Sequence, residues 1–366
     1  MKNAKVWRHF DFSLLGATLL AVIFGVAMIG SAIAGNQTLL DENLVTRQII
    51  YALAGLVIIF LTAAIDYRFW SAVSRPLYMF ICISLSLVSV VGLALFGGAR
   101  WLDAGIVLIQ PSELAKILLI IVLANFLARN RERLKQFRWI ILSLLYIGVP
   151  MGLIFIQPDL STALMLLVIW FAMLWAAGLR WGHLALFSSA GIAAPLLMWP
   201  LFQDYQKARI LQFVFPAADP DAQYNVNQSL ISIGSGGWFG QGYGHGTQVQ
   251  LRFLKVRHTD FIFSATAEEF GMVGALLMIL LLGFIVYRCL RAARLARDPF
   301  GALICFGVAT LIFYQAAFNI GMNLNLLPVA GLPLPFISYG GSSLLTKLLG
   351  IGLVESVILR QKQIEY

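Results

Sequence analysis

Long apolar blocks dominate the amino-acid sequence and constrain the fold more than any other feature. Each block can cross a hydrocarbon core of about 30 Å as a helix. In lipid, main-chain N–H and C=O groups must be paired inside the protein, so blocks of this length form helices. We therefore predict an all-α membrane bundle of about ten spans, at residues 12–34, 47–65, 74–96, 112–128, 139–156, 160–178, 183–202, 264–288, 300–324 and 340–359.

The composition agrees with a membrane domain. Only 12% of the 366 residues are charged, about half the share in a typical soluble protein. We interpret residues 1–366 as a single integral membrane domain. The first block is longer than a typical signal-peptide core and no clear cleavage site follows it, so we expect it to be retained as a span.

Lysine and arginine gather in alternate loops. They are frequent in both terminal segments and at residues 129–138 and 288–297, whereas the short loops on the other side hold only Arg47 and Arg100. The positive-inside rule then predicts that both termini are cytoplasmic and that the long loop at about 203–263, between spans seven and eight, is on the outer face. The net charge of +9 indicates topology and attraction to anionic lipid, rather than nucleic-acid binding.

Several common kinds of site are not indicated. The four histidines lack metal-ligand spacing, so no metal ligand is assigned. The three cysteines lie in or beside spans, which does not favour a disulfide framework. The glycine-rich residues 234–246 lack the lysine and hydroxyl residue of a P-loop. A mobile or tightly turning loop is predicted there.

Ionisable groups in or near the spans are candidates for function, because burying them costs free energy. Glu113 and Lys116 are three residues apart at the start of a predicted helix, so they can pair. They can form a structural ion pair, line with Arg100 a polar cavity for an anionic headgroup, or do both. Asp159 follows a short outer turn and either caps the next helix or belongs to the same site.

Asp260 is the strongest candidate for chemistry. It ends the outer loop, after Arg252, Lys255 and Arg257 and immediately before an apolar run. A partly desolvated carboxylate at this boundary suits a general base. The alternative is an N-cap for a helix that begins near Phe261.

Residues 319–343 form a second unusual segment. Their prolines and glycines prevent a continuous helix. Irregular backbone at membrane depth is tolerated only inside protein or against water. We therefore expect this segment to return into a cavity near the outer face.

These segments, in this order, resemble the SEDS family of shape, elongation, division and sporulation proteins. The resemblance covers essentially the whole chain and rests on residues 110–116, 157–159, 227–229 with 233–237, 258–263 and 328–342. Within the family, the chain is more similar to RodA, the elongation member, than to FtsW, the division member. One departure is that Lys255 and Val256 stand where the family usually has Pro and Glu, which makes the local field at Asp260 more positive.

The resemblance implies a peptidoglycan glycosyltransferase in the bacterial inner membrane that polymerises lipid II during elongation and shape maintenance. The implied reaction inverts the anomeric centre, with Asp260 as general base. Cations such as Arg100, Lys116 and Arg209 would stabilise the pyrophosphate leaving group. Other substrate contacts are expected at Glu113, Asp159, His258 and Ser338. The resemblance also implies a divalent cation, Mg²⁺ or Mn²⁺, as an assisting cofactor, and a class B penicillin-binding protein as partner.

Two other functions stay open from sequence: a transporter that flips a lipid-linked precursor, and a non-catalytic scaffold of a cell-wall complex. A transporter needs a polar path across the membrane, whereas Asp103, Asp159 and Asp260 all lie at predicted outer ends. Lys347 and Glu355, eight residues apart in the last span, are the only hint of a deeper path. We interpret them instead as a structural pair elsewhere in the bundle.

Overall fold

The protein was analysed as a computed structural model, in which the described residues are 7–34, 43–91, 93–95, 98–103, 108–179, 182–183, 185, 187, 189, 191, 199–215 and 220–361. Among these described residues, seven helices are long and apolar enough to cross a membrane: α2 (Phe12–Ile33), α4 (Leu44–Ala64), α7 (Pro111–Arg129), α8 (Phe137–Ile156), α14 (Ile262–Leu295), α15 (Pro299–Asn323) and α16 (Gly341–Ile358). Two shorter apolar helices, α6 (Ser74–Val91) and α9 (Leu160–Ala176), lie beside them. The predicted helical membrane bundle is confirmed, while most of the predicted span 183–202 lies outside the described residues.

The third predicted span is wrong at its end. Helix α6 stops at Val91, and a small antiparallel sheet follows with strands β1 (Leu93–Leu95), β2 (Gly98–Asp103) and β3 (Leu108–Ile109) in that order. The sequence here contains Gly92, Gly97 and Gly98, and glycine stabilises helices poorly. Strand pairing satisfies the main-chain groups of this segment in place of a helix.

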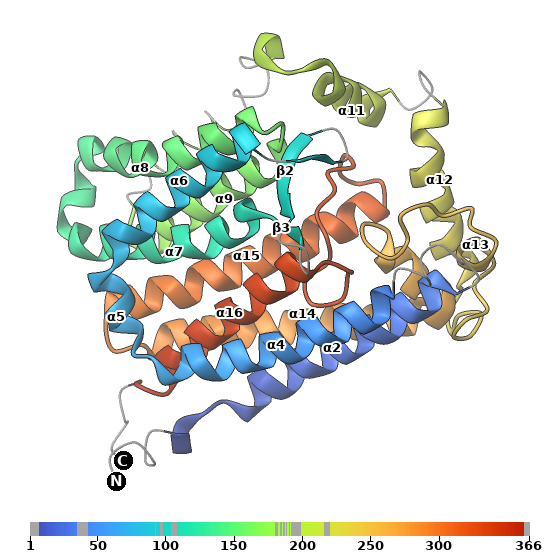
Figure 1. Ribbon diagram of the computed structural model, residues 1–366, viewed down its shortest axis with the longest axis horizontal. Coiled ribbons are helices and arrows are strands. Elements are labelled where there is room, and N and C mark those ends of the chain that lie inside the picture. The colour runs from blue at the N-terminus through green and yellow to red at the C-terminus, as the bar shows by residue number, and fades with distance from the viewer. Residues whose placement is uncertain are drawn as a thin grey trace.

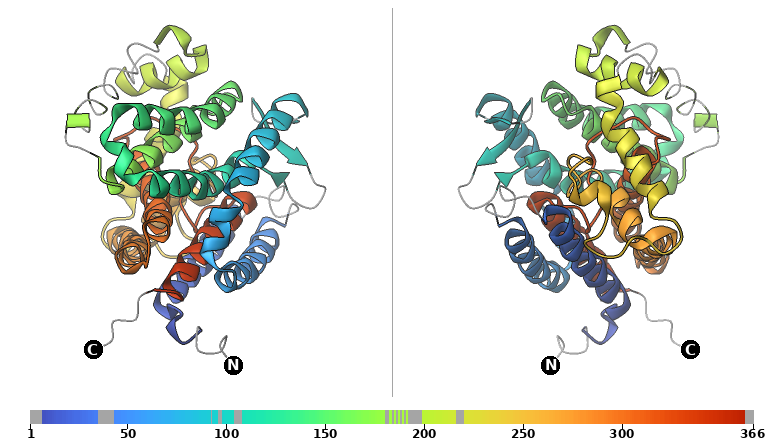
Figure 2. Two further views of the ribbon diagram at one scale, coloured as in Figure 1. Left: turned by 90° about the vertical axis from the view of Figure 1, so that its left-hand side faces the viewer. Right: turned by 90° about the vertical axis from the view of Figure 1, so that its right-hand side faces the viewer.

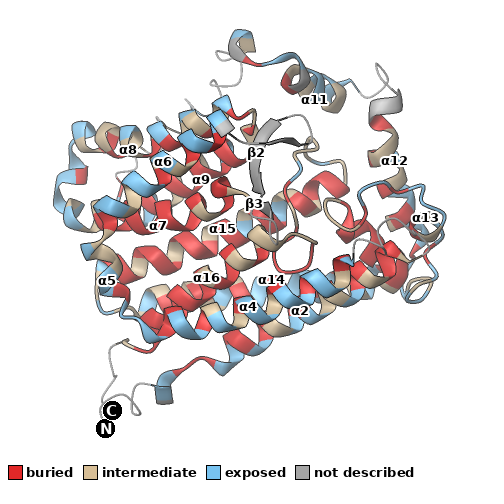
Figure 3. Ribbon diagram, viewed as in Figure 1, coloured by how far each residue is buried: buried red, intermediate tan, exposed pale blue. Residues whose placement is uncertain are grey.

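Helices α7, α15 and α16 form the buried centre of the bundle, whereas α4, α8 and α14 present much of their surface outward (Figure 3). Helix α16 packs against α4, and α14 packs against α15 and α2. The start of α2 and the end of α16 lie at one end of the bundle (Figure 1). The long loop contains α11 (Asp204–Val214), α12 (Pro220–Ser235) and α13 (Thr247–Gln250), and these lie toward the other end (Figures 1 and 2).

Helix α14 is interrupted at Gly271, where φ is 68°. The break frees main-chain groups, and the glycine-rich turn pairs them. The N–H groups of Met272 and Val273 donate to the carbonyls of Gly237 and Trp238, at 2.8 Å and 3.1 Å. The prediction of a tightly turning loop is confirmed by positive φ at four glycines, residues 237, 240, 242 and 244.

We expect Gly240→Ala to destabilise the protein. Gly240 has φ of 79°, and a Cβ there would lie 2.1 Å from the carbonyl oxygen of Glu269. The backbone strain alone costs about 1–3 kcal/mol, so the melting temperature of the purified protein in detergent should fall. Gly283→Ala in helix α14 is the control, because a Cβ there meets nothing within 4 Å. Equal melting temperatures for the two variants would contradict the proposed packing.

Candidate functional site

Two asparagines at the end of α15 hold the main chain of Asp260. Asn319 Nδ2 donates to the Asp260 carbonyl at 3.0 Å and to the Leu332 carbonyl at 2.8 Å. Asn323 Nδ2 donates to the same Asp260 carbonyl at 3.0 Å. Both asparagines are fully buried, so these bonds satisfy polar groups that would otherwise be costly to bury. The position of Asp260 is therefore fixed through its backbone.

Residues 327–340 run without helix or strand and pack against the loop that carries Asp260. Ser338 Oγ donates to the Thr259 carbonyl at 2.6 Å and accepts the Leu334 N–H at 2.8 Å. The Tyr339 N–H donates to the His258 carbonyl at 2.9 Å. Ser338, predicted as a substrate contact, thus uses its hydroxyl within the protein, and the irregular backbone is paired as the membrane environment requires.

The carboxylate of Asp260 is not used as a helix cap. Helix α14 begins at Ile262 with Phe261 as its N-cap. The carboxylate lies beside Gly331, where a Cβ would be 3.7 Å from Asp260 Oδ2. Of the two interpretations of Asp260, the capping one is not observed, and the carboxylate faces the irregular segment.

Burial raises the pKa of Asp260 to about 6, and the positive charge of Arg209 opposes that rise. Arg209 lies on α11 with an exposed side chain. Burial, helped by the Arg257 charge, lowers the pKa of His258 to about 4. The structure therefore brings Arg209 within electrostatic reach of Asp260 and leaves His258 neutral at pH 7.

The Arg257 side chain is buried and bonded within the protein. Its Nε donates to the Ala32 carbonyl at 2.5 Å, in the last turn of α2, where the helix dipole favours a cation. The side chain is 4% exposed. By contrast, the Lys255 side chain is exposed, and its Nζ lies 5.5 Å from the centre of the Tyr224 ring. Lys255 stands where the family usually has proline.

Glu113 joins two buried lysines. Lys116 Nζ lies 2.5 Å from Glu113 Oε1, and Lys347 Nζ lies 3.7 Å from Glu113 Oε2. All three side chains are at most 7% exposed. The structural ion pair predicted for Glu113 and Lys116 is present, and Lys347 also contacts Glu113, so the three side chains form one buried cluster. A role for these groups in substrate binding stays a prediction.

The remaining predicted contacts are placed as follows. Arg100 lies on β2, and its side chain is outside the described part of the structure. Asp159 caps α9: its Oδ1 accepts the Thr162 N–H at 3.2 Å. The neighbouring Ser161 donates to the Ala330 carbonyl at 2.7 Å. The turn at Asp159 thus contacts the same irregular segment as Asp260.

Sequence reasoning did not single out Asn319, Asn323 or Gln48 as individual site residues. Gln48 lies in α4, is 1% exposed, and exchanges 3.3 Å hydrogen bonds with the Ser338 carbonyl and the Gly340 N–H. The available signal was a polar residue inside or at the end of an apolar block. For the asparagines, the spacing of four also indicated a shared helix face.

No three His, Cys, Asp or Glu side chains of the described residues are grouped so that they could hold a metal ion together. Mg²⁺ commonly binds through one or two carboxylates and substrate phosphates, which needs no such group. Asp260 is the carboxylate of this site that could take part in that mode.

Comparison with known proteins places the chain in a family. The family model for FtsW, RodA and SpoVE, described as a cell cycle protein, matches residues 12–363. The chain is 37% identical to peptidoglycan glycosyltransferase MrdB of Escherichia coli, over 97% of this chain and 95% of MrdB. It is 35% identical to the probable peptidoglycan glycosyltransferase FtsW of Geobacter metallireducens, over 98% of this chain and 97% of that protein.

Two solved structures are similar to this chain over nearly its full length. A chain of a peptidoglycan synthase complex, in which polymerization and crosslinking are structurally coordinated, has a TM-score of 0.82 and 31% identity, over 97% of this chain and 99% of that one. The rod shape determining protein RodA of Thermus thermophilus has a TM-score of 0.72 and 31% identity, over 97% of this chain and 98% of that one.

We expect Glu113→Ala to destabilise the bundle strongly, because it leaves the ammonium groups of Lys116 and Lys347 buried without their shared carboxylate. Breaking a buried ion pair in this way typically costs about 3–5 kcal/mol. Thermal unfolding in detergent would measure the loss. The control is a triple variant, Glu113→Leu with Lys116→Met and Lys347→Met, which should recover much of it. A single variant as stable as the unmodified protein would refute the buried cluster.

Proposed function

This chain belongs to the SEDS family of FtsW, RodA and SpoVE, and we propose that Asp260 is the general base of the glycosyltransferase reaction that it catalyses. The protein is a multi-pass membrane peptidoglycan glycosyltransferase of the cell-elongation type. Lipid II, a disaccharide pentapeptide on undecaprenyl pyrophosphate, is the proposed substrate. The observation that carries the assignment is Asp260 itself: a carboxylate with a raised pKa, fixed through its backbone and influenced by the charge of an exposed arginine.

In the proposed reaction, Asp260 takes the proton from the 4-hydroxyl of the acceptor GlcNAc. That oxygen forms a bond to the anomeric carbon of the donor MurNAc, while the bond from this carbon to the pyrophosphate oxygen breaks. One displacement converts the α-linkage to a β-linkage without a covalent enzyme intermediate. A pKa near 6 suits this role, because the group is ionised at neutral pH yet more basic than an ordinary carboxylate.

Arg209 is the proposed partner of the pyrophosphate. Its side chain is exposed and its positive charge acts on Asp260, and guanidinium groups match phosphate oxygens in geometry and charge. As the bond to pyrophosphate breaks, negative charge grows on the leaving oxygens and a fixed cation stabilises it. The same cation favours the ionised form of Asp260, so one residue assists both the base and the leaving group.

The buried polar groups support a polymerase over a transporter. Lys347 contacts Glu113, whereas Glu355 Oε2 accepts the Asp11 N–H at 3.1 Å. The two groups that hinted at a deeper path therefore belong to separate networks at different positions along α16. A polymerase needs polar groups at one end only, and Asp260 and Arg209 meet that need.

The orientation and partners are part of the proposal. The basic loops favour cytoplasmic termini, and this orientation supports a position for Asp260 at the outer face of the bacterial inner membrane. Likeness to a chain of a peptidoglycan synthase complex supports a crosslinking partner of the class B penicillin-binding type. We also propose that a divalent cation enters with the pyrophosphate.

Asp260→Ala should abolish polymerisation, since the attacking hydroxyl loses its proton acceptor. The measurement is gel analysis of glycan formed from lipid II by purified protein in detergent, where no leaflets exist and transport cannot contribute. Asp204→Ala is the control, because Asp204 is an exposed acid at the start of α11 and should retain activity. Near-normal polymer from a folded Asp260→Ala protein would remove the base assignment.

The rate of polymerisation should fall as pH decreases through about 6, where Asp260 becomes protonated, with kcat/KM declining about tenfold per pH unit below it. Because Arg209 lowers the pKa of Asp260, Arg209→Ala should move this inflection to higher pH as well as slow the reaction. Lys207→Ala, on the same helix, is the control and should leave the inflection in place. An unchanged inflection in Arg209→Ala would show that the two groups are not coupled.

A further inference from the structure

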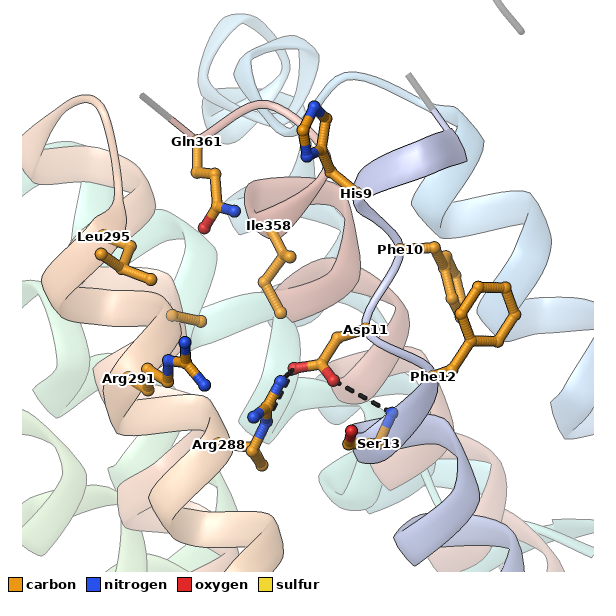
Figure 4. Close-up of a pocket in the computed structure, with 11 residues that line it drawn as sticks. His9, Phe10, Asp11, Phe12, Ser13, Arg288, Arg291, Leu295, Ile358 and Gln361 are labelled. Carbon is orange, nitrogen blue, oxygen red and sulfur yellow. Dashed lines mark hydrogen bonds and ion pairs between the residues drawn. The ribbon is translucent and has the colours of Figure 1, made fainter. Parts of the chain in front are cut away.

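A cavity of about 320 Å³ lies at the end of the bundle that holds the start of α2 and the end of α16. We call it the basal cavity. Its polar lining consists of His9, Asp11, Ser13, Arg288, Arg291 and Gln361, and the rest is apolar (Figure 4). Asp260 precedes the first turn of α14, whereas Arg288 and Arg291 lie in its last turns. The basal cavity is thus separate from the proposed catalytic site.

The charged groups of the basal cavity are not fully matched. Asp11 Oδ1 accepts the N–H groups of Ser13 and Leu14 and so caps α2, while Oδ2 accepts Arg288 Nε at 2.8 Å. Asp11 and Arg288 therefore neutralise each other. Glu355 is buried behind Asp11, bonded to its N–H, and does not line the cavity.

Arg291 is left as the unmatched cation of this cavity. It lies one turn after Arg288 on α14, and its side chain is exposed. Among the described residues no acid pairs with it, although Arg68 pairs with Asp298 and Arg360 with Asp66 near the same end. In Figure 4 its guanidinium lies next to Arg288, facing the cavity. An anion would complete this arrangement.

Aromatic residues mark the depth of the cavity. Phe12, the first residue of α2, is 71% exposed, and Trp7, in the segment that leads into α2, is 38% exposed. Trp7 stacks on Phe10, and Phe10 on Phe60 of α4, each pair with ring centres 5.7 Å apart. Exposed aromatic rings beside the end of a span are typical of the headgroup layer of a membrane.

We propose that the basal cavity binds the phosphate of an anionic phospholipid from the leaflet at this end of the bundle. Arg291 is the principal contact for the phosphate oxygens, which guanidinium groups bind well. Ser13 and Gln361 are the hydrogen-bonding partners available to a polyol headgroup, and the apolar lining suits the start of the acyl chains. The volume falls in the range of small-molecule sites. The headgroup-layer position favours a lipid over a soluble phosphate compound.

The test is native mass spectrometry of the full-length protein in detergent, titrated with phosphatidylglycerol. Arg291→Gln should weaken binding about fivefold, which corresponds to about 1 kcal/mol for one cation near an anionic headgroup. Arg291→Lys should retain most of the binding. Arg294→Gln is the matched control, because Arg294 is exposed on the same helix but does not line the cavity; it should bind as the unmodified protein does.

Two further titrations separate the sources of the phosphate. Phosphatidylcholine should bind more weakly than phosphatidylglycerol, and soluble glycerol 3-phosphate should not displace the lipid at equal concentration. Equal binding of the two lipids, or equal losses in Arg291→Gln and Arg294→Gln, would overturn the proposed site. Displacement by glycerol 3-phosphate would overturn the lipid assignment.

Discussion

The side-chain amides of Asn319 and Asn323 hold the irregular backbone on which the proposed chemistry depends. A main chain that is neither helix nor strand must still pair its polar groups within a membrane protein. These two amides pair the carbonyls of Asp260 and Leu332, and so join the start of α14 to the segment after α15. Ser338 and Tyr339 add the bonds to residues 259 and 258. Asp260 is therefore positioned by rigid neighbours, while its carboxylate stays available.

The cations of the chain are sorted by their surroundings. Arg257 is used at the end of α2, and Lys116 and Lys347 share Glu113 in the buried centre. Arg209 instead is exposed, and its positive charge acts on Asp260. A buried ion pair adds little net stability, but losing either partner destabilises the protein. We therefore assign Lys116 and Lys347, like Arg257, a structural role. A substrate phosphate can reach an exposed cation, which is why Arg209 carries the leaving-group role in our proposal.

The sequence predicted the helices well because the membrane imposes length and apolarity on each span. The same reasoning predicts that Asp260 lies at the water–lipid boundary. It failed at residues 93–95, where strand pairing replaced the end of a helix, since apolar composition alone does not distinguish the two. The sequence did not predict that Lys347 pairs with Glu113 instead of Glu355. Nor did it predict that the Ser338 hydroxyl donates a hydrogen bond to the Thr259 carbonyl. Those contacts join segments far apart in the chain, and no local pattern specifies them.

The central claim is that burial makes the Asp260 carboxylate more basic, while the positive charge of Arg209 opposes part of that effect. Direct titration of this one group tests it, through the carboxyl infrared band that differs between the unmodified protein and Asp260→Asn. The account predicts a midpoint near pH 6. A midpoint near 4, the ordinary value for an aspartate in water, would contradict it.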